Sequence, residues 1–278
     1  MISIATDYQK DTGCPYPYLQ AIAQAGFTHV HWCHHWCTDF LYAPSEIGQI
    51  QQWLEELGLK VTDLHASAGS EKAWASPREY ERLAGVELVV NRLEMAAAIG
   101  CDVAVLHIPG VPDDETGARE YWDRVRRSLD TLRQSSEATG VRIALENGGS
   151  DGTWVPLKQV FADYAPDFVG LCYDCGHGNM GGNGLGNLET HADRLIAIHL
   201  HDNDGTGDQH MLPFMGTVDW DRLMGLIARS SYEKWVNLEL SQSRSGYEEG
   251  DGAAFVREAR AIADRLSSAL DAARRSSS

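Results

Sequence analysis

The chain alternates short apolar runs with longer stretches in which apolar residues recur every three or four positions. The first pattern is typical of buried parallel strands and the second of amphipathic helices. We predict strands at residues 2–6, 28–32, 61–65, 103–108, 142–146, 168–173, 196–201 and 235–240. We predict helices at residues 16–25, 44–57, 78–99, 118–139, 156–164, 185–193, 219–228 and 253–270. Each predicted strand is therefore followed by a helix.

The loops of this pattern differ in length at the two ends of the strands. Gly26, Gly58, Gly100 and Gly140 each follow a predicted helix and precede the next strand by a few residues, as helix-ending glycines do. The connections after the strands are longer and richer in polar residues. This asymmetry predicts an α/β fold, a single (β/α)₈ TIM barrel, with a doubly wound sheet as the alternative. We assign residues 1–271 to one domain and residues 272–278 to a frayed C-terminal tail.

Composition narrows the classes of function. The 278 residues include 23 Lys and Arg against 40 Asp and Glu, a formal net charge of −17 that disfavours nucleic acid as a partner. The N-terminus lacks the pattern of a signal peptide, and no apolar run is long enough to span a membrane. We therefore expect a cytoplasmic protein with no membrane partner. The six cysteines are too few for a disulfide scaffold, and we expect most of them to be reduced.

Ligand-type residues follow one predicted strand after another. In a barrel, the C-terminal ends of the strands and the loops after them build the active site. The residues at those ends are His65, His107, Glu146, Asp174, His177, His199, His201, Asp208, His210 and Glu239. A single histidine or carboxylate at a strand end is usually structural. Several carboxylates buried around one barrel mouth repel one another unless a cation neutralises them, so the set predicts a divalent metal site.

The same residues lie in an ordered set of short motifs along nearly the whole chain. The motifs are Asp63-Leu64-His65-Ala66, Leu106-His107, Ala144-Leu145-Glu146-Asn147, Tyr173-Asp174-Cys175-Gly176-His177, His199-Leu200-His201-Asp202 and Asn237-Leu238-Glu239. No single motif is specific, but their order resembles the xylose isomerase-like barrel superfamily of sugar phosphate isomerases and epimerases. That superfamily also includes ketose 3-epimerases, inosose dehydratases, hydroxypyruvate isomerase and endonuclease IV.

The resemblance implies roles for individual residues. It implies that one metal ion shared across the superfamily is held by Glu146, Asp174, His199 and Glu239. It implies that five more residues complete the three-metal pattern of endonuclease IV, namely His65, His107, His177, Asp208 and His210. The metal count therefore lies between one and three. The mixed nitrogen and oxygen ligands favour Mn²⁺ or Zn²⁺, with Fe²⁺, Co²⁺ or Mg²⁺ as alternatives.

Two of these glutamates are also candidates for catalysis. Glu146 and Glu239 come from different strands, so each can reach a carbon-bound proton of a substrate from its own side. We expect them to act as general acid and base, with proton abstraction next to a metal-bound carbonyl. The resemblance then implies a metal-dependent isomerase, epimerase or related lyase of carbohydrate metabolism, acting on a keto sugar or polyol.

Other residues are candidates for substrate contact. His177 and His201 are expected to hold substrate oxygens, although His201 faces the same side of its strand as His199, and these two histidines can exchange roles. After the second predicted strand, Trp36 can stack on a sugar ring while His34 or His35 binds hydroxyls. A purely structural loop that closes the top of the barrel accounts equally well for these last three residues.

Two other functions remain open at this point. One is a metal-dependent phosphodiesterase similar to endonuclease IV, which the nine metal-type residues favour and the acidic charge disfavours. The other is a noncatalytic sugar-binding subunit. The expected partner is a small sugar or polyol, and the resemblance also implies that the chain can form a homo-oligomer.

Overall fold

Eight parallel strands form one sheet in the computed structural model, which describes residues 1–277. The strands are β1 (Ile2–Ala5), β2 (His29–Trp32), β3 (Lys60–His65), β4 (Val103–His107), β5 (Arg142–Glu146), β6 (Val169–Asp174), β7 (Leu195–His199) and β8 (Val236–Leu238). Their order is β7-β6-β5-β4-β3-β2-β1-β8, so neighbours in sequence are neighbours in the sheet, and β8 pairs with β1. All eight predicted strands are present, with ends shifted by at most two residues.

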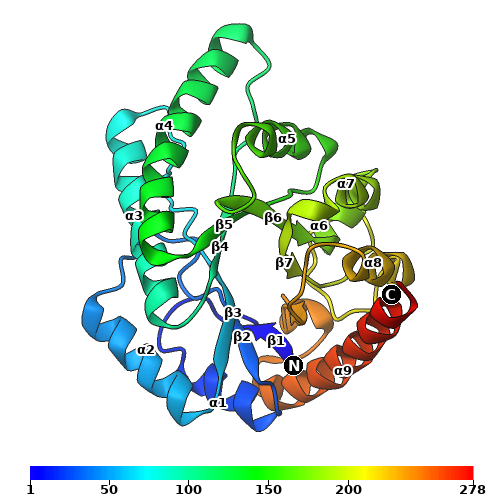
Figure 1. Ribbon diagram of the computed structural model, residues 1–278. Helices are drawn as coiled ribbons and strands as arrows, with labels where there is room; N and C mark the ends of the chain where they lie inside the picture. The colour runs from blue at the N-terminus through cyan, green and yellow to red at the C-terminus, as the bar shows by residue number, and fades with distance from the viewer. Residues whose placement is uncertain (278) are drawn as a thin grey trace.

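The sheet closes into a barrel where β7, at one end of this order, meets β8, at the other end. Leu200, just beyond β7, forms a parallel bridge with Leu238 of β8. The Leu200 amide donates to the Asn237 carbonyl at 3.0 Å, and the Glu239 amide donates to the Leu200 carbonyl at 3.1 Å. Helices surround the strands on the outside (Figure 1). The predicted (β/α)₈ barrel is therefore confirmed, and the doubly wound alternative is excluded.

The helices agree with the periodicity except at one place. They are α1 (Tyr16–Gln24), α2 (Pro44–Glu56), α3 (Glu79–Ala98), α4 (Glu115–Thr139), α5 (Trp154–Asp163), α6 (Cys175–Met180), α7 (Gly184–Thr190), α8 (Trp220–Ala228) and α9 (Gly252–Ser277). The sequence did not predict α6, because its six residues, CGHGNM, carry no apolar stripe. This helix begins directly after β6, and its third residue, His177, lies beside the barrel mouth.

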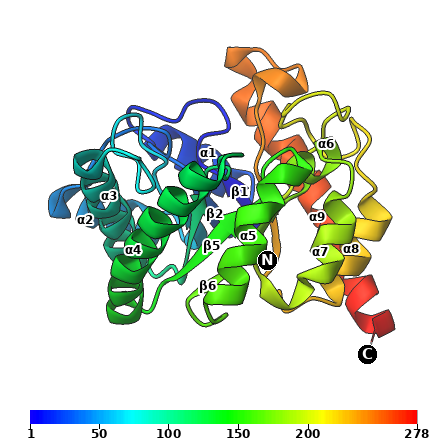
Figure 2. The same cartoon turned by 90° about the horizontal axis from the view of Figure 1, so that it is seen from above.

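The C-terminal helix is longer than expected. Residues 272–277, predicted to fray, continue α9 to Ser277, while residue 278 lies outside the described part of the chain. Arg274 in the last turns donates to the carbonyls of Tyr232 and Lys234 at 2.8 and 3.0 Å. Figure 2 shows α9 beside α8 along one side of the barrel. The domain boundary at residue 271 stays a prediction.

The interior of the barrel changes from apolar to polar along the strands. A small apolar cluster within it includes Val105, Ala144, Cys172 and Ala197. Side chains alternate between the two faces of a strand, so the residue two positions later also faces inward. At those positions stand His107, Glu146, Asp174 and His199. The barrel therefore places its metal-type residues in one layer at the C-terminal ends of the strands.

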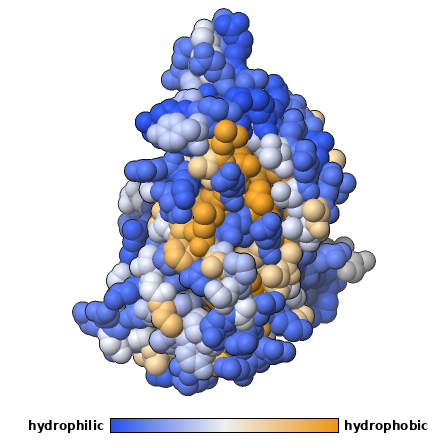
Figure 3. All heavy atoms as spheres, turned by 90° about the vertical axis from the view of Figure 1, so that its left-hand side faces the viewer, coloured by the Kyte–Doolittle hydropathy of each residue, from blue (hydrophilic) through white to orange (hydrophobic). Residues whose placement is uncertain are grey.

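The outer surface is mostly polar. On the side that carries α2, α3 and α4, apolar side chains gather in the middle of the face and polar side chains surround them (Figure 3). Leu83 of α3 is 51% exposed. Among the described residues, no helix is long and apolar enough to cross a membrane.

Candidate metal centre

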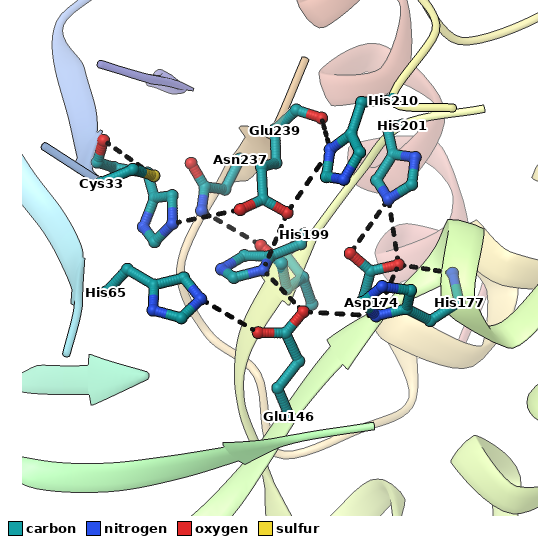
Figure 4. A network of polar contacts seen from close by, with 12 residues as sticks. Cys33, His65, Glu146, Asp174, His177, His199, His201, His210, Asn237 and Glu239 are labelled. Atoms are coloured by element: carbon teal, nitrogen blue, oxygen red, sulfur yellow. Dashed lines mark hydrogen bonds and ion pairs between the residues drawn. The ribbon is translucent and has the colours of Figure 1, made fainter. Parts of the chain in front are cut away.

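Three residues from three strands meet at the barrel mouth, and we call them the strand-end cluster: Glu146, His199 and Glu239. His199 Nδ1 lies 3.3 Å from Glu146 Oε1 and 3.1 Å from Glu239 Oε2 (Figure 4). The His199 ring is completely buried, and neither of its nitrogens has a hydrogen-bond partner that meets normal geometry. A buried nitrogen between two carboxylates is a donor set that suits a divalent cation.

The second oxygen of Glu146 faces two further histidines. Glu146 Oε2 lies 3.0 Å from His107 Nε2 and 3.4 Å from His65 Nε2. The ligand atoms of these three residues lie within 4.8 Å of one another, close enough to hold one ion. Glu146 therefore lies between two groups of possible donors.

A second set of residues lies just beyond the strand ends, and we call it the loop cluster: His177, His201, Asp208 and His210. His177 Nε2 lies 3.5 Å from Asp208 Oδ2, and His210 Nε2 hydrogen bonds the same oxygen at 2.9 Å. The rings of His201 and His210 stack with their centroids 4.1 Å apart. These contacts bring α6 and the loop after β7 together at one edge of the mouth.

Asp174 contacts the loop cluster, and His177 links both to Glu146 of the strand-end cluster. His201 Nε2 lies 3.0 Å from both oxygens of Asp174. The Asp174 carboxylate also accepts the His177 amide at 2.6 Å and so caps α6. His177 Nδ1 lies 3.6 Å from Asp174 Oδ1 and 3.5 Å from Glu146 Oε1. Of the two histidines that sequence could not separate, His199 therefore contacts Glu146 and Glu239, whereas His201 contacts Asp174.

The loop that carries Asp208 and His210 is held by a buried carboxylate. Asp202 accepts the amides of Phe214 and Val218 at 2.8 and 3.1 Å and the Trp220 indole N–H at 3.0 Å. His210 itself has a φ of 47°, a left-handed conformation that is uncommon for a residue other than glycine. The loop cluster thus depends on a network outside the barrel strands.

Opposite charges dominate the electrostatics of both clusters. Burial raises the pKa of Glu146 and Glu239, but His199 and other nearby histidines lower it more, so both carboxyl groups titrate well below their usual range. Burial lowers the pKa of His177, but Asp174 and Asp208 raise it more, to about 12. Because metal ligands bind without their protons, ion binding at these histidines must release protons.

The three substrate contacts predicted in the loop after β2 lie in two different places. The Trp36 ring packs against His65 and His107, with centroids 4.7 and 5.5 Å apart, so it borders the metal-type residues. His34 and His35 instead line a cavity of about 320 Å³ whose other lining residues include Phe40 and Tyr42 but none of the predicted ligands. The stacking of His35 on Phe40, with centroids 4.2 Å apart, holds its ring toward that cavity.

Two buried residues beside the strand-end cluster were not predicted from the sequence to belong to the site. His31 and Asp63 are partners in the register of β2 and β3, and both side chains face the barrel interior with no exposure. Burial lowers the pKa of His31, but Asp63 raises it more, to about 9. The alternation of His29, His31 and Cys33 along β2 is the signal that could have revealed this inward face.

All six cysteines are free, and two of them, Cys14 and Cys37, are exposed. Burial raises the pKa of the Cys172 thiol well above its usual value. Cys172 lies close to Glu146 and His199, with the ligand atoms of the three residues within 4.8 Å of one another. The Cys172 thiol therefore borders the strand-end cluster as a neutral group.

Comparison with known proteins matches the sequence to one family. A family model described as "Xylose isomerase-like TIM barrel" matches residues 19–273. An uncharacterized protein of Sinorhizobium fredii, y4fM, is 34% identical over 282 residues, which cover 92% of this chain and 89% of that protein.

Solved structures of lower sequence identity share the fold. A structure of L-ribulose 3-epimerase has a TM-score of 0.75 at 17% identity, and the match covers 99% of this chain and 96% of that one. A structure of the IOLI protein with a binding zinc atom has a TM-score of 0.74 at 15% identity, covering 96% and 99%. At these identities the likeness concerns the fold alone.

Proposed function

The chain belongs to the xylose isomerase-like TIM-barrel family, and from this premise we propose that it is a divalent-metal-dependent isomerase or epimerase, or a related lyase, acting on a keto sugar or polyol. The observation that carries the proposal is the strand-end cluster. Two glutamates from different strands approach the same buried His199 nitrogen at 3.3 and 3.1 Å. Two carboxylates that converge on one site from different strands are suited to move a proton from one side of a carbon and return it from another.

The residues present fit a metal ion. Glu146, His199 and Glu239 would hold it, and Asp174, the partner of His199 in the register of β6 and β7, would be the fourth ligand. Mn²⁺ or Zn²⁺ suits this mixed oxygen and nitrogen set, with Fe²⁺, Co²⁺ or Mg²⁺ as alternatives. When bound, the ion would supply Lewis acidity that makes a proton next to a carbonyl group easier to remove.

The two glutamates differ in how far they open to the mouth. The Glu239 side chain is 12% exposed, whereas that of Glu146 is 2% exposed. Both carboxyl groups have a pKa well below its usual range and are ionised at neutral pH, so either can accept a proton. We propose that Glu239 meets the substrate carbon more directly, and that Glu146 serves the opposite side while it contacts His65 and His107.

His177 and His201 also differ in how far their side chains are exposed at the mouth. His177 is 16% exposed and its pKa is raised to about 12, so it can donate a hydrogen bond to a substrate oxygen. His201 is fully buried against Asp174. We propose that His177 contacts the substrate directly and that His201 acts by holding Asp174. Arg244 borders the loop cluster, because its guanidinium donates to the Asp208 carbonyl.

The test is a pair of substitutions, Glu146→Gln and Glu239→Gln, measured with metal-loaded protein on a panel of ketoses and polyols. Each change removes one proton-transferring carboxylate, so we expect kcat to fall by about 10²–10⁴-fold. Exposed Glu87→Gln on α3 is the matched control and should leave kcat unchanged. Full turnover in both active-site variants would rule out the assignment.

A phosphodiesterase similar to endonuclease IV is the second candidate function. The observation in its favour is that Glu146 contacts His65 and His107 on one oxygen and His177 on the other, so donors for more than one ion surround it. Elemental analysis separates the two candidates, because one bound ion supports the epimerase proposal and three support the phosphodiesterase. Cleavage of abasic DNA by the purified protein would favour the second candidate. Bound metal without turnover of either substrate class would indicate a noncatalytic sugar-binding protein.

A further inference from the structure

A buried pair of side chains stands directly behind the strand-end cluster. His31 on β2 and Asp63 on β3 have no exposed surface, and His31 Nδ1 hydrogen bonds Asp63 Oδ1. The His31 ring packs against the ring of His199, with centroids 4.4 Å apart and an angle of 50° between the planes. The pair therefore touches the candidate metal ligands without facing solvent.

Asp63 is itself fixed from a third strand. Asn237 Nδ2 donates to Asp63 Oδ1 at 3.2 Å and to the Ile198 carbonyl at 3.1 Å. The amide thus ties the carboxylate to β8 and β7, while the carboxylate sets the orientation of the imidazole. These contacts fix the orientation of the His31 ring. They therefore also fix where its other nitrogen, Nε2, points.

This nitrogen of His31 points at Glu239. His31 Nε2 lies 3.7 Å from Glu239 Oε1, and this nitrogen has no hydrogen-bond partner. The other oxygen, Glu239 Oε2, lies 3.1 Å from His199 Nδ1. The ring therefore stands between the Asp63 carboxylate on one side and the Glu239 carboxylate on the other. It fills the space beside Oε1 and leaves Oε2 facing the cluster.

Stability alone does not account for this arrangement. Buried ion pairs contribute little net stability, since the loss of hydration offsets most of the attraction. By contrast, side chains that support a metal ligand from behind orient it and change metal affinity or activity by about 10–100-fold when removed. The position of His31 behind Glu239 matches the second description.

We propose that His31, oriented by Asp63, is a positioning residue that fixes the Glu239 carboxylate so that Oε2 faces His199 and the reacting site. The proposal rests on the proposed function, because it requires Glu239 to serve as a metal ligand and proton-transfer group. Without His31, the Glu239 carboxylate can turn toward the space that the imidazole filled. Metal affinity then falls, and kcat falls more than KM changes.

The experiment compares His31→Gln with His29→Gln in the full chain. Both substitutions remove an imidazole from a position on β2 that is at least 96% buried, but His29 hydrogen bonds Thr28 and packs against Trp235 with centroids 4.0 Å apart. Chelator-treated protein is titrated calorimetrically with Mn²⁺ and with Zn²⁺. We expect His31→Gln to weaken the first binding step by about 10–100-fold and His29→Gln to leave it unchanged.

A spectroscopic measurement keeps the test independent of turnover and of stability. With Co²⁺ as the probe ion, His31→Gln should shift the visible absorption bands that report ligand geometry, and His29→Gln should not. Asp63→Asn gives a second route, because it keeps the side-chain shape and removes the anion that orients His31. We expect Asp63→Asn to weaken metal affinity and shift the Co²⁺ bands in the same direction as His31→Gln, but by a smaller amount.

The possible outcomes separate the two proposals. Unchanged affinity and unchanged Co²⁺ bands in both His31→Gln and Asp63→Asn overturn the positioning role while the proposed function stands. Loss of one whole metal equivalent in His31→Gln, with unchanged affinity for the rest, makes His31 a ligand and also overturns it. Absence of divalent metal binding by the unchanged protein overturns the proposed function, and the positioning role with it.

Discussion

The strand-end cluster and the loop cluster are built from the same residue types by different means. Glu146 and His199 are the last residues of β5 and β7, and Glu239 directly follows β8. Asp208 and His210 lie in the loop between β7 and α8, where a buried Asp202 holds the backbone. The barrel therefore specifies the first cluster through strand register, and the second depends on one loop conformation.

This difference suggests that the two clusters have different tasks. Residues on strands keep their positions to within a fraction of an ångström, as a metal site requires. Loop residues can move more easily and often govern binding and access. We expect the strand-end cluster to bind the first ion and the loop cluster to adjust affinity for substrate or for a further ion.

The largest expected contrast comes from removing one histidine of each cluster. His199→Gln should abolish the first metal equivalent, whereas His210→Gln should retain it, because His199 lies between Glu146 and Glu239 at 3.3 and 3.1 Å and His210 Nδ1 lies 3.9 Å from Glu239 Oε2. Thermal unfolding with Mn²⁺ or with chelator measures the difference. At metal concentrations about 100 times Kd, bound ion stabilises the folded state by roughly 2.7 kcal/mol, and His199→Gln should lose this increment. Equal losses of the metal-dependent stabilisation in both variants would show that the two clusters form one metal site.

A smaller effect is expected from loosening the loop alone. Asp202→Asn leaves buried N–H groups with a weaker acceptor, so we expect the free energy of unfolding to fall by about 1–3 kcal/mol and the loop to become more sensitive to proteolysis. Exposed Asp204, which bonds only local groups such as Thr206, provides the control Asp204→Asn. Chemical denaturation and limited proteolysis check both changes. A first metal equivalent that disappears with Asp202→Asn would show that the strand-end cluster also depends on the loop.

The smallest expected effect lies at the opposite end of the barrel and provides a baseline for both clusters. Burial and nearby cations lower the pKa of His29 to about 4, so the folded state holds this ring neutral while the unfolded chain binds a proton below about pH 6.5. Stability should therefore fall as the pH drops from about 6.5 to 4, and His29→Gln should reduce that slope. Denaturation of chelator-treated protein across this range measures it. If His29→Gln leaves the slope of stability against pH unchanged, the titratable residues of the two clusters account for the loss of stability in acid.

Much of the fold could be predicted because each local signal agrees with the barrel. Apolar runs, helical periodicity and the glycines at helix ends place all eight strands. Helix α6 was missed because a short capped turn without an apolar stripe leaves no periodic signal, and its start depends on Asp174 accepting the His177 amide. The predicted end of α9 was wrong for a similar reason, since tertiary bonds from Arg274 hold a segment whose own pattern is weak.

The sequence by itself determined which strand ends carry histidines and carboxylates, because the two-residue period of a strand assigns inward positions from order alone. Only the tertiary structure decided the pairing: His199 between two glutamates, His201 on Asp174, and His34 and His35 in a separate cavity. It also revealed His31 and Asp63 behind Glu239. The reason is that barrel closure sets residues far apart in sequence side by side, and the distances between their side chains depend on register and packing across strands, which no local pattern encodes.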